Sequence, residues 1–244
     1  MSFQPSLKRL MNVEMNVTCK KRGFFPHGGG EIVLQTNPIS QQKSGDDEEK
    51  KLNENSEKQN ALPAFTLTER GDVQAVRGIA IVTHGAQQYL RKHLPQNVKI
   101  QIDVSKEDTR SSASAIVVVA ETTKGLLFGG SALGDKKIQR TNAQIGEAAA
   151  EELLNDLFHN GKNCCVDRCL QDQLIIFAAL AKGKSEFKCG ALELHTKTAI
   201  HFAEIMTGCK FKVTEYKNMK NENGEQMDCK THISCEGIGL LNTF

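Results

Sequence analysis

Tryptophan is absent from this 244-residue sequence, and only 5% of the residues are aromatic. Proteins that bind single-stranded nucleic acids by base stacking use aromatic side chains. We therefore expect base stacking to contribute little to any RNA binding by this chain. Charge of one sign is not in excess either, because the formal net charge is +2. The net charge therefore gives no indication that long-range electrostatics attract the protein to nucleic acid or to a membrane. It is compatible with a local basic groove.

Long apolar segments and paired cysteines are also lacking. The longest apolar run covers residues 174–181, far short of the roughly 20 residues that cross a bilayer, and no signal-peptide pattern opens the chain. None of the eight cysteines forms a C-x-x-C pair, and the seven histidines show no H-x-x-H or H-E-x-x-H spacing. We therefore expect a soluble intracellular protein with reduced cysteines, no structural zinc and no membrane partner.

Hydrophobic patterning predicts an α+β fold with mixed sheets. Strands are expected at residues 13–19, 31–36, 65–68, 73–82, 98–104, 115–120, 125–130, 187–194, 211–216 and 228–235. Helices are expected at about residues 86–94, 141–159, 167–181 and 196–206. Asn223-Gly224 indicates a hairpin turn between the last two strands.

Two of these helices carry start signals. Thr141 and Gln144 form the pattern of a capping box, and behind them Ile145, Ala149, Leu153 and Leu157 recur every four residues. Asp167 is a suitable cap for the next helix. By contrast, residues 41–60 contain a single apolar residue, Leu52, so we expect a disordered polar insertion there.

A glycine-rich loop is the first candidate for chemistry. Residues 22–30 read RGFFPHGGG and lie between two predicted strands. Gly28, Gly29 and Gly30 allow backbone N–H groups to approach an anion, and Arg22 is suited to pair with a phosphate. The alternative is a plain glycine turn, and the loop is not a P-loop because no G-K-[ST] sequence ends it.

His195 is the second candidate, at a point where a predicted strand gives way to a helix. The start of a helix favours phosphate oxygens and disfavours a protonated imidazole, so the ring would stay neutral and nucleophilic. Histidine is a reasonable nucleophile for phosphoryl or nucleotidyl transfer. From position alone, a structural histidine is the alternative.

Asp172 and Gln173 are the third candidate, as polar residues beside the apolar face of a hydrophobic helix. They are able to hydrogen-bond a ligand. The alternative places them on an ordinary surface, with Arg168 and Asp172 as a helical ion pair.

In this order, four motifs resemble those of the RNA 3′-terminal phosphate cyclases. They are residues 22–32 (RGFFPHGGGEI), 126–134 (LLFGGSALG), 170–181 (LQDQLIIFAALA) and 194–204 (LHTKTAIHFAE). The resemblance implies a large domain of repeated βαβαββ-like units with a smaller inserted α/β domain. By match, residues 1–36 and 135–244 fall in the large domain, 37–63 in the polar insertion and 64–134 in the shortened smaller domain.

The resemblance also implies an activity. The family uses ATP, through a covalent histidine–AMP, to convert RNA 3′-phosphate ends to 2′,3′-cyclic phosphates. His195 matches the adenylated histidine, and Asp172 and Gln173 match residues of the adenylate pocket. Cys169 stands where family members usually carry Tyr, and Pro5 matches a further nucleotide contact loosely. A divalent ion, Mg²⁺ or Mn²⁺, would neutralise the triphosphate, and DNA is excluded because it lacks the 2′-OH that closes the ring.

Certain departures from the family pattern leave a second hypothesis open. The family's front third, which supplies an acidic residue, an arginine and a glutamine near ATP, has no counterpart in this sequence. The polar insertion and Cys169 are further departures. We therefore weigh an active ligase-class cyclase against a catalytically inactive scaffold in RNA processing or ribosome biogenesis. A nuclear location is expected from the resemblance alone, and the metal ligands and oligomeric state are left open.

Overall fold

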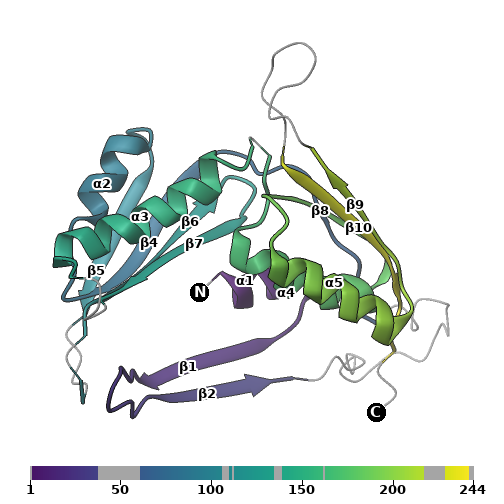
Figure 1. Cartoon of the computed structure of the whole chain (residues 1–244), viewed down its shortest axis with the longest axis horizontal. Helices are drawn as coiled ribbons and strands as arrows, with labels where there is room; N and C mark the ends of the chain where they lie inside the picture. The colour runs from purple at the N-terminus through teal and green to yellow at the C-terminus, as the bar shows by residue number, and fades with distance from the viewer. Residues whose placement is uncertain are drawn as a thin grey trace, which may run out of the picture.

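The computed structural model describes residues 2–37, 61–105, 110–111, 113–134, 139–161, 163–216 and 229–241. The described elements form three separate sheets, two of which carry helices (Figure 1). This mixed arrangement confirms the predicted α+β class. The predicted insertion at residues 41–60 and the Asn223-Gly224 turn lie outside the described residues.

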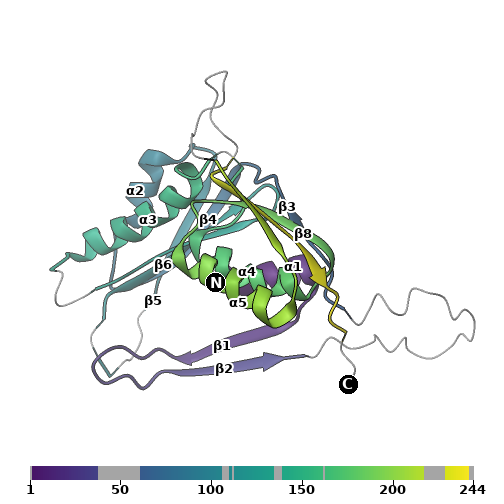
Figure 2. The ribbon, with the colours of Figure 1, turned by 45° about the vertical axis from the view of Figure 1, so that its right-hand side comes forward.

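One sheet follows the βαβαββ order. Its elements are β3 (Thr66–Leu67), α4 (Arg168–Leu180), β8 (Lys182–Cys189), α5 (Leu194–Thr207), β9 (Phe211–Glu215) and β10 (Thr231–Ile238). The strands lie in the order β3-β8-β10-β9, with β3 parallel to β8 and the other pairs antiparallel. Helix α4 packs on β8 and β10 and alongside α5, so both helices lie on one face of the sheet (Figures 1 and 2).

A second sheet is inserted in the sequence between β3 and α4. It consists of β4 (Val73–Ile81), β5 (Lys99–Ser105), β6 (Ala115–Thr122) and β7 (Leu127–Leu133), with α2 (Ala86–His93) and α3 (Asn142–Phe158). Its strand order is β5-β4-β6-β7, and α3 packs against β6, β7 and α2. The capping box of Thr141 and Gln144 is present, and the four apolar residues predicted behind it are all buried.

The remaining elements are a short helix and a hairpin. Helix α1 (Phe3–Met11) leads into β1 (Met15–Lys21), which pairs with β2 (Glu31–Thr36) in an antiparallel two-stranded sheet. Most residues of both strands are exposed, among them Val17, Ile32 and Leu34. The hairpin lies along the bottom of the view in Figure 1, below α1.

The structure differs from the sequence predictions in two places. The hydrophobic patterning predicts no helix where α1 lies. It predicts a strand at residues 187–194, whereas β8 is Lys182–Cys189 and α5 begins at Leu194. The first half of β8 is rich in lysine, but Ser185, Phe187 and Cys189 point alternately into the core, which is the period-two pattern of a half-buried strand.

Two further segments pack on these sheets. Ala61 and Leu62 are buried, and Ala61 and Pro63 bridge to Leu241 and Lys182 beside the β3-β8-β10-β9 sheet. Helix α3 packs against β6 and β7.

Candidate functional site

The candidate site lies where the N-terminal halves of α4 and α5 meet. Cys169, Asp172 and Gln173 come from α4, and His195 lies in the first turn of α5. Between the two helices, the Thr196 hydroxyl donates a hydrogen bond of 2.6 Å to Oε1 of Gln171. Because Asp172 and His195 each neighbour one of these partners, the structure brings them to the same end of the helix pair. Asp172 is half-buried, whereas Cys169, Gln173 and His195 are exposed.

The start of α5 is exposed at Glu193, Leu194 and His195. Its first intrahelical hydrogen bond runs from the Lys197 amide to the Glu193 carbonyl (3.1 Å), so the amides of residues 194–196 precede it. The Glu193 side chain makes no capping bond. Amides at such a position point outward at the positive end of the helix dipole, which is an environment for an anion such as a phosphate. His195 stands within this turn.

By contrast, the start of α4 is occupied by a side-chain cap. Asp167 caps the helix by accepting the Leu170 amide at 2.7 Å, as the sequence predicted. Its other carboxylate oxygen accepts the Gly129 amide of β7 at 2.8 Å. These hydrogen bonds lower the pKa of the Asp167 carboxyl, but burial has the larger effect and raises it. An anion would meet an occupied terminus here, so the structure favours α5 over α4 as its location.

Cys169 is a poor nucleophile in this setting. Partial burial raises the pKa of its thiol, and the nearby charge of Asp167 raises it further. A thiol with a raised pKa stays protonated at neutral pH, and the thiolate is the reactive form. Within the α4–α5 site, His195 is thus the better candidate for a nucleophile.

Pro5 lies on a different element, α1. It is an exposed residue of α1, and α1 is held beside α4 by contact between the rings of Phe3 and Phe177, whose centroids are 6.0 Å apart. The geometry places α1 next to α4 (Figure 1).

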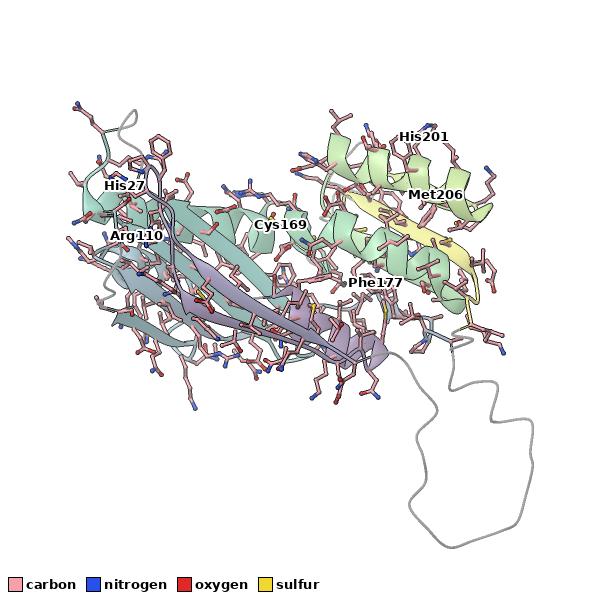
Figure 3. The ribbon with its side chains drawn as sticks, turned by 90° about the horizontal axis from the view of Figure 1, so that it is seen from below. His27, Arg110, Cys169, Phe177, His201 and Met206 are labelled. Atoms are coloured by element: carbon pink, nitrogen blue, oxygen red, sulfur yellow. The ribbon has the colours of Figure 1, made fainter. Side chains whose placement is uncertain are left out.

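The glycine loop is not part of the α4–α5 site. It forms the distant tip of the β1–β2 hairpin, where the His27 amide donates to the Ser111 hydroxyl at 3.2 Å and Gly29 lies against the Arg110 side chain. Figure 3 shows His27 and Arg110 at one end of the molecule, well away from Cys169 and farther still from His201. The structure therefore separates Arg22, Gly28, Gly29 and Gly30 from His195.

Backbone geometry accounts for the glycines in this loop. Gly28 and Gly29 adopt left-handed conformations with φ of 57° and 79°. The backbones of Gly23 and Gly30 approach so closely that a Cβ on Gly23 would lie 2.3 Å from the Gly30 nitrogen. These features are what the alternative of a tight glycine turn requires.

The motif at residues 126–134 also has a packing role. A Cβ on Gly130 would lie 2.4 Å from the Ala149 carbonyl oxygen of α3, whereas Gly129 supplies its amide to Asp167. These two glycines let α3 approach β7 and tie β7 to α4.

Sequence reasoning missed Gln171 and Thr196, which are both 1% exposed. A signal was available, because Gln171 lies three and four residues before the buried Leu174 and Ile175 and so shares their helix face. Within the described part of the chain, no group of three His, Cys, Asp or Glu side chains is arranged to hold a metal ion. Among the described helices, none is long and apolar enough to span a membrane.

Comparison with known proteins identifies similar sequences over nearly the whole chain. The family model described as RNA 3′-terminal phosphate cyclase matches residues 1–213. A probable RNA 3′-terminal phosphate cyclase of Dictyostelium discoideum is 35% identical over 95% of this chain and 50% of its own length. An RNA 3′-terminal phosphate cyclase of Drosophila melanogaster is 31% identical over 98% of this chain and 60% of its own. The chain thus spans about half the length of these curated relatives.

Proposed function

Because the chain belongs to the RNA 3′-terminal phosphate cyclase family, we propose that it takes part in the ATP-dependent conversion of RNA 3′-phosphate ends to 2′,3′-cyclic phosphates. The proposed site is the start of α5 with the adjoining half of α4. The observation that carries this proposal is the exposed His195 in a helix start whose Glu193 side chain makes no capping bond.

In the proposed reaction, His195 attacks the α-phosphate of ATP through a ring nitrogen, and pyrophosphate leaves. The resulting phosphoramidate passes AMP to the RNA 3′-phosphate and frees the imidazole. The neighbouring 2′-OH then attacks the activated phosphate, AMP leaves, and a 2′,3′-cyclic phosphate remains. Ring closure gains from the fixed position of the 2′-OH. The same requirement limits the substrate to RNA ends and excludes DNA.

The α5 amides at residues 194–196 would hold phosphate oxygens near His195. Asp172 and Gln173, one turn into α4, would bind polar groups of the nucleotide, and Pro5 and Cys169 would border them. Since no three-ligand cluster exists among the described residues, Mg²⁺ or Mn²⁺ would be bound mainly through the triphosphate, as is common for Mg²⁺. Its contribution would be to neutralise phosphate charge.

The test is incubation with α-³²P-labelled ATP and Mg²⁺ or Mn²⁺, followed by denaturing separation of the protein. We expect a labelled band that is lost in His195→Ala. His201→Ala is the matched control, since His201 is also exposed on α5, and it is expected to keep the label. Label that survives in His195→Ala would contradict the assignment of the nucleophile.

A second candidate function is binding without catalysis, as a scaffold in RNA processing or ribosome biogenesis. The specific observation in its favour is Cys169, which stands where family members usually carry Tyr, so that an aromatic contact to the nucleotide would be lost. A folded chain that binds RNA but acquires no label from ATP would favour it. For either function we propose a nuclear location, which imaging of a fluorescent fusion would test.

A further inference from the structure

Gln171 is a fully buried amide in the apolar inner face of α4. Its neighbours on that face include Leu174 and Ile175, which are also buried. Its oxygen accepts the Thr196 hydroxyl at 2.6 Å, and its nitrogen donates to the carbonyls of Ala191 at 3.3 Å and Gly190 at 3.5 Å. A single side chain thus holds both the loop that precedes α5 and the first turn of α5.

These bonds act on the part of α5 that lacks a side-chain cap from Glu193. Thr196, which is as deeply buried as Gln171, directly follows His195 in the sequence. Since successive helical residues point about 100° apart, a bond that fixes the direction of the Thr196 side chain inward also fixes His195 outward. The direction in which the His195 side chain leaves α5 is therefore coupled to the bond between Thr196 and α4.

We propose that Gln171 and Thr196 are positioning residues for His195: their hydrogen bond locks the start of α5 in the register that aims the imidazole at the bound phosphate. This inference rests on the proposed function of His195. Both residues are buried and so are not placed to touch the substrate. Both act by holding the turn that carries the nucleophile and the amides of residues 194–196.

Burial alone does not account for this arrangement. An apolar side chain of similar volume would fill the same space without the free-energy cost of desolvating a polar group. A buried amide is tolerated only when its hydrogen bonds are made. The amide oxygen and nitrogen of Gln171 both have partners in the segment from Gly190 to Thr196. Such directional bonds specify one position of a packed element in addition to stabilising it.

The principal variant is Thr196→Val, which keeps the branched shape and removes the hydroxyl. Thr196→Ser restores the hydroxyl, and Thr198→Val is the matched control on an exposed site of the same helix. The rate of protein–AMP formation is measured over a range of ATP concentrations, and thermal unfolding confirms that each variant is folded. Misplacing a reacting group by about 1 Å costs on the order of 100-fold in rate.

We expect Thr196→Val to lower the rate at saturating ATP by about 10- to 100-fold, with little change in the half-saturating ATP concentration. Thr196→Ser should recover most of the rate, and Thr198→Val should match the wild type. A rate for Thr196→Val equal to that of Thr198→Val would overturn the proposal. So would an effect confined to the half-saturating ATP concentration, which would indicate a binding role.

Amide hydrogen exchange gives a readout that does not depend on activity. Thr196→Val and the near-isosteric Gln171→Met should speed exchange at residues 190–197 much more than in the last two turns of α4. If the wild type acquires no label, the proposed function of His195 fails, while the lock between Gln171 and Thr196 is still judged by this measurement. Unchanged exchange at residues 190–197 in both variants would overturn the lock itself.

Discussion

The carboxylate of Asp167 accepts the backbone N–H of Gly129 at 2.8 Å while it caps α4 through the amide of Leu170 at 2.7 Å. One buried side chain thereby connects β7 of the inserted sheet to the helix that carries Asp172. The inserted sheet and the α4–α5 layer are thus joined at the start of α4, close to the candidate site.

Replacing Asp167 should weaken this junction. Asp167→Ala removes the cap of α4 and leaves the Gly129 amide without its acceptor, so the free energy of unfolding should fall by about 2–3 kcal/mol. Urea denaturation followed by circular dichroism measures the change. Thr141→Ala removes the exposed cap of α3 alone and should cost about 1 kcal/mol. Equal losses in the two variants would show that the bond to Gly129 contributes little.

The two glycines of β7 offer a matched pair of substitutions. In Gly130→Ala the new Cβ would lie 2.4 Å from the Ala149 carbonyl oxygen, so α3 must move away from β7. We expect a loss of about 1–3 kcal/mol in stability. In Gly129→Ala the nearest heavy atom is 3.5 Å from the new Cβ, which is an ordinary contact, and the loss should be much smaller. Thermal unfolding of both variants compares them, and a reversed order would refute the packing described for α3.

Asp156 should make stability depend on pH. Burial raises the pKa of its carboxyl from 3.8 to about 6. Between these values the folded chain holds the proton more tightly than the unfolded chain, so this group's contribution to stability falls as pH rises toward 6. Above pH 6 the buried carboxylate destabilises the folded state by about 2–3 kcal/mol.

Asp156→Asn removes this titration. The free energy of unfolding of the variant, relative to that of the wild type, should be about 2 kcal/mol higher at pH 7 than at pH 4. Urea unfolding of both proteins at several pH values in this range measures the difference. Parallel pH profiles would contradict the raised pKa of Asp156.

The glycine loop permits a test that separates conformation from chemistry. Gly28 has a φ of 57° with open space around it, so Gly28→Val should cost about 1–2 kcal/mol through backbone strain. Asparagine tolerates this region, so Gly28→Asn should cost less. Because the loop lies far from Cys169 of the α4–α5 site (Figure 3), Gly28→Asn should still acquire AMP from labelled ATP. Loss of the label in a folded Gly28→Asn protein would instead assign the loop a part in adenylation.

Local signals in the sequence predicted local structure well. The range of α3 follows from Thr141, Gln144 and the four-residue apolar spacing, and the cap of α4 follows from Asp167. These features depend on residues within one or two turns of each other. The predicted start of β8 was wrong because the lysine-rich first half of this strand is formed by pairing with β10, which lies more than forty residues later in the chain.

The candidate site shows the same limit. His195, Asp172, Gln173 and Pro5 remain predictions in their nucleotide-binding roles, although the structure places the first three at one end of the helix pair. The separation of the glycine loop from His195 is a tertiary property that motif order along the chain does not contain. The buried bond between Gln171 and Thr196 likewise joins two segments 25 positions apart.

The position of β10 has a consequence for synthesis of the chain. This strand comes last among the described elements, yet it lies between β8 and β9 in the interior of its sheet, and it follows the end of the family match at residue 213. While the ribosome still holds residues 231–238, β8 and β9 have no strand to join them, and α4 lacks part of the surface on which it packs. Because pairing between distant strands is slow and exposes apolar surface until it is complete, the α4–α5 layer would stay open until β10 has left the ribosome. A nascent chain would therefore acquire its histidine site only after residues 231–238 have emerged and paired.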